Sequence, residues 1–138
     1  MTFKLDHIGW VTNNVGLFEH FWCRGLGFEK IWEANIMVEK TRALFRWDGT
    51  TRAMRYKKGD MTIEIHVFDP PVTGENNNFV RFGINHIGLW VEDREKFLEE
   101  LKEKLGYVEV HKYYDPSGWW NIFIRDYEGN WIELRTAL

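Results

Sequence analysis

Two short segments of the chain, 5–11 and 84–91, mix apolar and polar positions in the manner of half-buried strands. The first reads LDHIGWV and the second INHIGLWV, and both are rich in β-branched and aromatic residues. Such composition favours β structure. Turn-forming and helix-capping residues follow, Asn13 and Asn14 in one case and Asp93 in the other, so we predict a helix after each strand.

Both predicted helices carry apolar residues at helical spacing and end at glycine. The apolar positions are Leu17, Phe18, Phe21 and Trp22 in the first helix, before Gly25 and Gly27, and Phe97, Leu98, Leu101 and Leu105 in the second, before Gly106. Residues three or four positions apart share one face of a helix, and glycine is common just beyond a helix C-terminus. Each helix is therefore expected to pack one face on a sheet.

The sequence contains an internal repeat. Shifted by 79 positions, 5–31 aligns with 84–110 without a gap, and His7 falls on His86. Further on, MTIEI at 61–65 matches NWIEL at 130–134, which places Glu64 on Glu133 at an offset of 69. The first copy is thus longer, and 32–47 is the natural place for the extra residues. A repeat of this kind indicates that the fold is built from two copies of one structural unit.

Each copy has room for three further strands, separated by turn sequences such as Lys58-Gly59-Asp60 and Glu128-Gly129-Asn130. The pattern predicts an α+β fold of two tandem βαβββ modules, 1–68 and 80–138, within a single domain spanning 1–138. The segment between them, DPPVTGENNNF at 69–79, has the prolines and asparagines of a connector.

Successive side chains of a strand point to opposite faces of its sheet. One face of the predicted strands is apolar and suits helix packing: Ile8, Trp10, Ile63, Ile65, Val67, Ile87, Leu89, Val91, Ile132 and Leu134. The other face carries four ionisable residues at repeat-equivalent places, together with two tryptophans: His7, Glu64, His86, Glu133, Trp90 and Trp131. Solvent exposure of one face would explain the polar residues, whereas the tryptophans indicate a pocket wall.

Four motifs carry a family resemblance: DHIG at 6–9, TIEI at 62–65, NHIG at 85–88 and WIEL at 131–134. With them, the sequence resembles the vicinal oxygen chelate superfamily, which includes glyoxalase I, methylmalonyl-CoA epimerase, extradiol dioxygenases and the bleomycin and fosfomycin resistance proteins. The resemblance covers essentially the whole chain. It implies a glyoxalase-like fold, in which a curled mixed sheet surrounds a metal cleft, and it implies four metal ligands: His7, Glu64, His86 and Glu133.

Two imidazoles and two carboxylates suit a divalent ion such as Zn, Ni, Co, Mn or Fe(II). Four protein ligands would leave two octahedral positions for adjacent oxygens of a small-molecule substrate. The ion would then act as a Lewis acid when a proton leaves the carbon next to a carbonyl. We therefore expect a glyoxalase-like or epimerase-like lyase or isomerase that works through a metal-bound enediolate. Its base would be Glu133 or Glu64, with a slight preference for Glu133.

Two other functions fit parts of the same pattern. An Fe(II) dioxygenase of the extradiol type would use only His7, His86 and Glu133 as ligands, and the content of 8 Trp and 10 Phe suits an aromatic substrate. Ring-cleaving relatives are usually longer, and here the fourth ligand position holds a good ligand. A non-catalytic drug-binding resistance protein is the third candidate, although relatives of that kind typically lack the metal ligands.

The substrate pocket is expected to include His66, Trp90, Trp131 and Arg135. His66 shares the face of Glu64 and could be a pocket residue, an alternative ligand, a partner of the ligand or a rim residue. Arg135 has the matching place in the second module, where it could steer an anionic group or pair with a carboxylate. The longer segment 32–47 is a candidate lid.

A basic cluster lies within and just after the segment 32–47: Lys40, Arg42, Arg46, Arg52, Arg55, Lys57 and Lys58. It could capture a carboxylate, a phosphate or a coenzyme A tail, or it could be a solvated strand face.

Composition adds limits rather than chemistry. The net charge of -3 gives no global attraction to nucleic acid or anionic membranes, and no apolar run approaches the roughly 20 residues of a membrane span. The single cysteine, Cys23, excludes an internal disulfide and is expected to be a reduced packing residue. We expect a cytoplasmic protein with no nucleic-acid or membrane partner and, from the resemblance, a homodimer.

Overall fold

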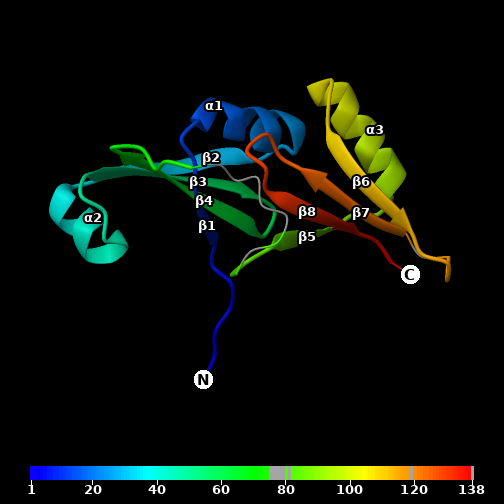
Figure 1. The fold of residues 1–138 in the computed structure, drawn as a ribbon, viewed down its shortest axis with the longest axis horizontal. Helices are drawn as coiled ribbons and strands as arrows, with labels where there is room; N and C mark the ends of the chain where they lie inside the picture. Colours follow the sequence, from blue (N-terminus) through cyan, green and yellow to red (C-terminus); the bar gives the residue numbers. More distant parts are fainter. Residues whose placement is uncertain (75–79, 81, 119, 138) are drawn as a thin grey trace. The chain divides into compact units, whose positions relative to one another are not determined.

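The computed structural model describes residues 1–74, 80, 82–118 and 120–137. Contacts divide the chain into two compact units. Unit 1 comprises Met1–Cys23 and Gly27–Gly74, and unit 2 comprises Arg24–Leu26 and Glu75–Leu138. Each unit contains one four-stranded mixed sheet with a helix on one face, as the ribbon shows (Figure 1).

Unit 1 contains the sheet β1-β4-β3-β2. Its elements are β1 (Ile8–Val11), α1 (Val15–Phe18), η1 (Glu19–Gly25, π-helical), β2 (Glu29–Ile36), α2 (Val38–Phe45), β3 (Thr50–Lys58) and β4 (Met61–Asp69). Strand β1 pairs with β4 in parallel, and the other pairs are antiparallel. Asn14 begins α1 as predicted, because its side chain accepts a hydrogen bond from the Leu17 amide at 3.1 Å.

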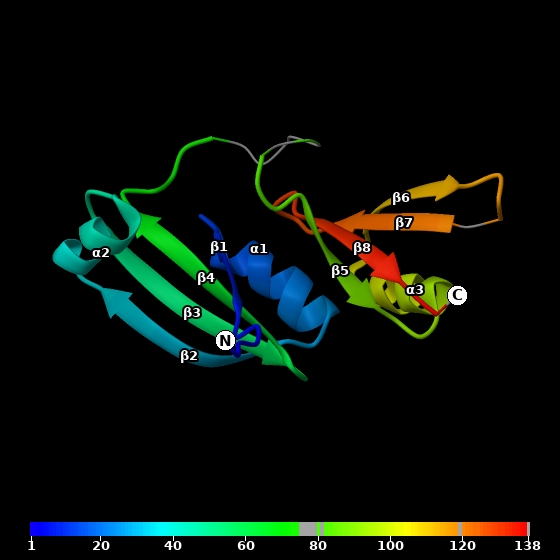
Figure 2. The same ribbon diagram turned by 90° about the horizontal axis from the view of Figure 1, so that it is seen from below.

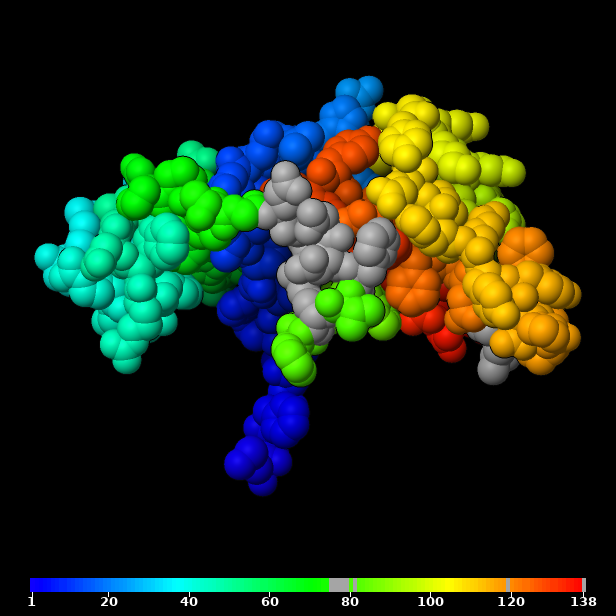
Figure 3. Space-filling view, viewed as in Figure 1, coloured from blue at the N-terminus to red at the C-terminus, as the bar shows by residue number. Residues whose placement is uncertain are grey.

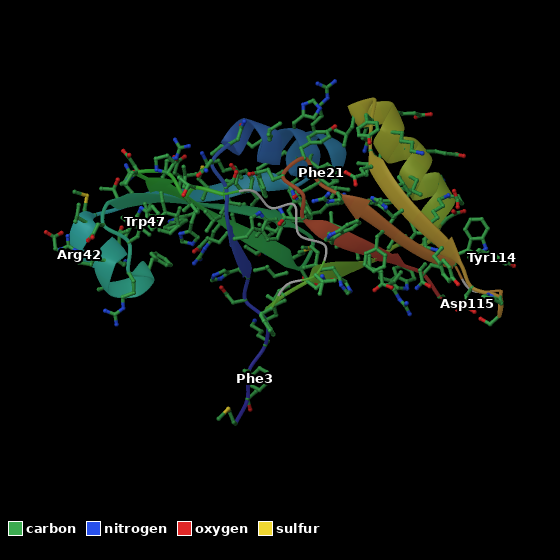
Figure 4. The ribbon with its side chains drawn as sticks, viewed as in Figure 1. Phe3, Phe21, Arg42, Trp47, Tyr114 and Asp115 are labelled. Atoms are coloured by element: carbon green, nitrogen blue, oxygen red, sulfur yellow. The ribbon has the colours of Figure 1, made fainter. Side chains whose placement is uncertain are left out.

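An aromatic cluster fills the space between η1 and the sheet of unit 1. Phe21, labelled in Figure 4, and Trp22 are fully buried, and the Trp22 ring lies 5.3 Å from that of Trp10 and 5.4 Å from that of Phe28. From the sheet side, Ile63 and Ile65 are equally buried. Burial of large side chains in this way is the main stabilisation of a helix on a sheet.

Unit 2 repeats the arrangement with the sheet β5-β8-β7-β6. Its elements are β5 (His86–Trp90), α3 (Arg94–Leu105), β6 (Glu109–Tyr114), β7 (Trp120–Arg125) and β8 (Trp131–Arg135). Strand β5 pairs with β8 in parallel, as β1 does with β4. Figure 2 shows α3 on one face of this sheet, and the core consists of apolar side chains from both layers: Leu98, Leu101, Val108, Ile122, Ile124, Ile132 and Leu134.

The ends of α3 lie where the sequence predicts them. Asp93 caps the first turn by accepting a hydrogen bond from the Lys96 amide at 3.0 Å. Gly106 ends the helix at a φ of 80°, and its amide donates to the Lys102 carbonyl at 2.7 Å. A positive φ at this position favours glycine because it has no Cβ.

The extra length of the first module forms helix α2, which lies between β2 and β3. Thr41 is buried and donates to the Ile36 carbonyl at 3.1 Å, with Thr51 Oγ1 at 3.2 Å. Arg42 and Trp47 flank its C-terminal end (Figure 4), where Trp47 donates to the Pro70 carbonyl at 3.0 Å. These contacts tie the inserted segment to the end of the sheet.

The α+β fold of two βαβββ modules is therefore confirmed, with α2 as an addition. Part of the predicted connector, 75–79, lies outside the described residues, and β4 continues to Asp69. At the other end of the chain, the segment before β1 protrudes from unit 1 (Figure 3), and its Phe3 is exposed. No described helix is long and apolar enough to cross a membrane.

Candidate metal-binding pairs

The four predicted ligands form two pairs, one in each unit, and each pair lies on the sheet face opposite the helix. In unit 1 the register places Gly9 of β1 beside Glu64 of β4, and His7 directly precedes β1 on the same side as Gly9. In unit 2 the register places Gly88 beside Glu133, and His86 begins β5. The glycines leave room above the strand between each histidine and its glutamate.

In unit 1, Nε2 of His7 lies 3.9 Å from Oε1 of Glu64. The other ring nitrogen, Nδ1, is 2.7 Å from Oδ2 of Asp6. This hydrogen bond lowers the pKa of Asp6 below its usual value, so Asp6 is ionised at neutral pH and accepts the Nδ1 proton. The neutral imidazole then has its lone pair on Nε2, on the side of Glu64.

Unit 2 contains the same arrangement. Nε2 of His86 lies 3.5 Å from Oε2 of Glu133, and Nδ1 is 2.9 Å from Oδ1 of Asn85. The Asn85 carbonyl oxygen accepts from Nδ1, which again leaves the lone pair on Nε2. In metal sites, a ligating imidazole commonly donates its second N–H to a carboxylate or carbonyl, which fixes the tautomer. Both histidine rings thus direct Nε2 toward a glutamate and Nδ1 toward the preceding side chain.

The two glutamates differ in how firmly they are held. Glu64 is only 8% exposed, its Oε2 accepts a hydrogen bond from Nε of Arg55, and its Oε1 lies 2.8 Å from Nε2 of His66. Burial alone would raise the pKa of Glu64, but the hydrogen bonds from Arg55 and His66 outweigh it, and the pKa is lowered. Glu64 is therefore a buried carboxylate that stays ionised at neutral pH.

Glu133 is held on one side only. Nη1 of Arg135 donates to its Oε1 at 3.1 Å, while Oε2 lies toward His86. The residue two positions after each glutamate therefore pairs with it in both modules, His66 in one and Arg135 in the other. Of the two predicted roles for Arg135, the structure shows the carboxylate pairing.

The donor set of the two pairs fits a divalent ion of borderline hardness, with two imidazole nitrogens and two carboxylates. Over the described residues of either unit, no group of three or more His, Cys, Asp or Glu side chains is arranged to hold a metal ion. Each unit by itself thus brings together two of the four predicted donors.

The remaining predicted pocket residues lie on the same faces. In unit 2, Trp131 lines a pocket of about 280 Å³ together with Asn85, His111 and Phe123. Trp90 is opposite Arg135 in the register and is exposed. In unit 1, His66 packs against Phe45 of α2, with ring centroids 5.0 Å apart. The inserted segment therefore contacts a partner of Glu64, and its predicted role as a lid stays a prediction.

Several residues of these faces were not identified from the sequence. Asp6 and Asn85 are repeat-equivalent residues directly before the histidines, a signal that the alignment contained. Arg55 belonged to the basic cluster, whose members have separate partners: Arg42 pairs with Asp48 at 2.8 Å, and Arg52 lies 3.6 Å from Glu33. His111 and Phe123 become visible only once the register of β6, β7 and β8 is known.

Comparison with known proteins identifies the family of the chain. The sequence profile of the Glyoxalase/Bleomycin resistance protein/Dioxygenase superfamily matches residues 6–123. The chain belongs to this superfamily. No curated protein matches the sequence. Members of the superfamily include metalloenzymes, bind small molecules and are often dimeric.

Solved structures of the superfamily share the fold at low sequence identity. A glyoxalase family protein from Enterococcus faecalis is 23% identical, with 95% of each chain covered and a TM-score of 0.73. One from Bacillus cereus is 18% identical over 100% of this chain and 96% of its own, with a TM-score of 0.74. A variant of the fosfomycin resistance protein FosX from Listeria monocytogenes, complexed with Mn(II) and 1S,2S-dihydroxypropylphosphonic acid, is 17% identical over 98% and 90%, with a TM-score of 0.62.

Proposed function

We propose that the protein is a divalent-metal-dependent lyase or isomerase of the vicinal oxygen chelate type, which removes a proton from the carbon next to a carbonyl of a small substrate with adjacent oxygens. The observation that carries the proposal is the repeated pair: in each module a histidine directs Nε2 toward a glutamate while the preceding side chain holds Nδ1. His7, Glu64, His86 and Glu133 would hold the ion.

When bound, the ion would supply Lewis-acid stabilisation of negative charge on a substrate oxygen. The chain itself must supply the base. Glu133 suits this role better than Glu64, because Arg135 holds only its Oε1 and leaves Oε2 without that partner. Both oxygens of Glu64 are engaged, by Arg55 and by His66, so this carboxylate is fixed in place.

The fixed position of Glu64 also favours one alternative. A carboxylate already paired with Arg55 and His66 can stay outside the ligand set, which would leave His7, His86 and Glu133 as the two-histidine, one-carboxylate triad of an Fe(II) dioxygenase. The two functions differ in what Glu64 does, so a single substitution separates them.

Elemental analysis of purified protein tests the metal site. We expect stoichiometric divalent metal in the wild type, loss of the metal in His7→Ala and in His86→Ala, and retention in His20→Ala, which removes an exposed histidine from η1. A wild-type chain that takes up no Zn, Ni, Co, Mn or Fe, although circular dichroism shows it folded, would refute the proposal.

Glu64→Gln then distinguishes the two reactions. If Glu64 is a ligand, this variant loses metal affinity, and the wild type exchanges the proton next to a substrate carbonyl with deuterium oxide. If it is not, Glu64→Gln keeps its metal, and the iron-loaded protein consumes oxygen with catechols. The first result is the one we expect.

We also propose that the protein is a homodimer, as small members of the superfamily often are. Light scattering coupled to size exclusion measures this directly. Mixing His7→Ala with His86→Ala chains shows whether the metal site lies within one chain or between two chains. Hybrid dimers would regain metal only if His7 of one chain and His86 of the other serve the same ion.

A further inference from the structure

The ligand-bearing face of unit 2 continues beyond His86 and Glu133 toward the far edge of its sheet. Across the strands β6, β7, β8 and β5, one row of paired residues consists of His111, Phe123, Glu133 and Gly88, and the next row of Glu109, Arg125, Trp131 and His86. Directly paired residues point to the same face of a sheet. The two rows therefore form one surface that leads from the proposed ligands to His111.

Aromatic rings fill the middle of this surface. The Phe123 ring lies 5.1 Å from that of His86 and 6.1 Å from that of Trp131, and the Trp131 ring lies 4.8 Å from that of His111. The guanidinium of Arg125 stacks on Trp131 at 4.9 Å. A pocket of about 280 Å³ opens among these rings. A cavity of about 150 Å³ is enough for benzene, so this pocket has room for one ring with a substituent.

His111 is the titratable group of the pocket wall, and its ring is fixed from outside the pocket. Its Nε2 lies 2.7 Å from Oε1 of Glu109, which in turn has Nη1 of Arg125 at 3.7 Å. Because a carboxylate can only accept, Nε2 carries the proton, and Nδ1 of the neutral ring is an acceptor. Among the described residues Nδ1 has no hydrogen-bond partner, so it is available to a hydroxyl group.

The first module has different residues at the equivalent places. Arg55, opposite Glu64, stands where Phe123 stands opposite Glu133, and Trp32, opposite Arg55, stands where His111 stands. The guanidinium of Arg55 stacks on the Trp32 ring at 5.1 Å and binds Glu64. Module 1 thus uses these positions to hold a carboxylate, whereas module 2 keeps them for a pocket.

We propose that this pocket binds a single aromatic ring of the substrate and that His111, held by Glu109, accepts a hydrogen bond from a hydroxyl group on that ring. The inference rests on the proposed function, because it assumes that the adjacent oxygens of the same substrate lie near His86 and Glu133. It adds the substrate class: a small hydroxyaryl compound with two neighbouring oxygens.

Three ligands with the same adjacent-oxygen end test the proposal: lactate, mandelate and 3-hydroxymandelate. Dissociation constants are measured by calorimetry on the Mn-loaded protein. Mandelate is expected to bind about tenfold more tightly than lactate, because its ring would pack against the Phe123 and Trp131 rings and remove apolar surface from water. 3-Hydroxymandelate should bind about three- to tenfold more tightly than mandelate, because its ring hydroxyl adds one hydrogen bond.

The variants assign these gains to residues. Phe123→Leu should reduce the ratio of mandelate affinity to lactate affinity. His111→Leu should remove the gain in affinity from the ring hydroxyl but keep the gain from the ring itself. Trp120→Leu, on the same strand β7 but of opposite parity, should change neither ratio. Equal binding of mandelate and lactate by the metal-loaded wild type, or an unchanged hydroxyl gain in His111→Leu, would overturn the inference.

Phenol separates this inference from the proposed function, because it lacks the adjacent-oxygen end. Ligand-observed NMR of the metal-free protein should detect phenol binding that Phe123→Leu weakens and Trp120→Leu does not. If the protein takes up no metal but binds phenol in this way, the ring pocket stands and the proposed reaction fails. If metal is bound but phenol binding is absent or is insensitive to Phe123→Leu, the pocket assignment fails.

Discussion

Replacing Arg55 by methionine removes one of the two hydrogen bonds that the described residues make to the buried carboxylate of Glu64. Methionine keeps an apolar stem against the Trp32 ring, so the main loss is the charge-assisted hydrogen bond to Oε2. A hydrogen bond to a charged group contributes about 1.5–3 kcal/mol, and breaking a fully buried pair costs about 3–5 kcal/mol. Since the Arg55 side chain is 38% exposed, we expect a value near the lower range, about 2 kcal/mol.

The assay is thermal unfolding followed by circular dichroism at neutral pH. For a chain of 138 residues, a loss of about 2 kcal/mol lowers the Tm by about 7 °C. Arg52→Met is the matched control on the same strand. The ion pair between Arg52 and Glu33 is exposed and 3.6 Å long, so its loss should leave the Tm nearly unchanged.

The pH dependence of the effect has a definite sign. The pKa of Glu64 in the folded protein is lowered from 4.5, so its stabilising pairing is fully present above that pH. It is lost as the pH falls through the folded-state pKa. The difference in Tm between the wild type and Arg55→Met should therefore be constant near neutral pH and shrink in acid.

The double variant Arg55→Met/Glu64→Gln completes the cycle. It should be more stable than the sum of the single losses predicts, because a glutamine at position 64 needs no counter-charge. Two results would contradict this reasoning: a Tm of Arg55→Met equal to that of the wild type, or a loss of stability in the double variant equal to the sum of the two single losses. Either would show that the pairing with Arg55 does not stabilise the ionised carboxylate of Glu64.

Three further predictions concern the scaffold. Gly49→Ala should destabilise the protein more than Gly106→Ala, because a Cβ at Gly49 would lie 2.0 Å from the Asp69 carbonyl oxygen. A Cβ at Gly106 would meet no neighbour, and the φ of 80° there would cost an alanine only about 1 kcal/mol of strain. Equal urea midpoints for the two variants would contradict this. Leu101→Ala should cost about 2–5 kcal/mol, because Leu101 is 2% exposed, and an unchanged urea midpoint would show that α3 contributes little. Burial raises the pKa of Cys23 from 9.0 to about 11, so iodoacetamide at pH 8 should alkylate the folded protein about a hundredfold more slowly than the unfolded chain; mass spectrometry measures both rates, and equal rates would refute the shift.

Much of the fold could be predicted because its signals are local. The cap at Asp93 and the stop at Gly106 depend on hydrogen bonds within a few residues, so the sequence reveals them directly. The apolar parity that includes Ile63 and Ile132 also needs only the strand period, and both residues are fully buried. Helix α2 was not predicted, because it starts without a side-chain cap at Met37 and its buried residue is the polar Thr41.

The sequence by itself determined the duplication, the two modules and the face on which each histidine and glutamate lies, because a repeat and the two-residue period of a strand are properties of the chain alone. Only the tertiary structure decided which neighbours modify those residues. Arg55 meets Glu64 across two strands, and His111 reaches the pocket across three, so their roles depend on sheet register. Register is fixed by pairing between distant segments, and for that reason the difference between the two carboxylates belongs to the folded protein.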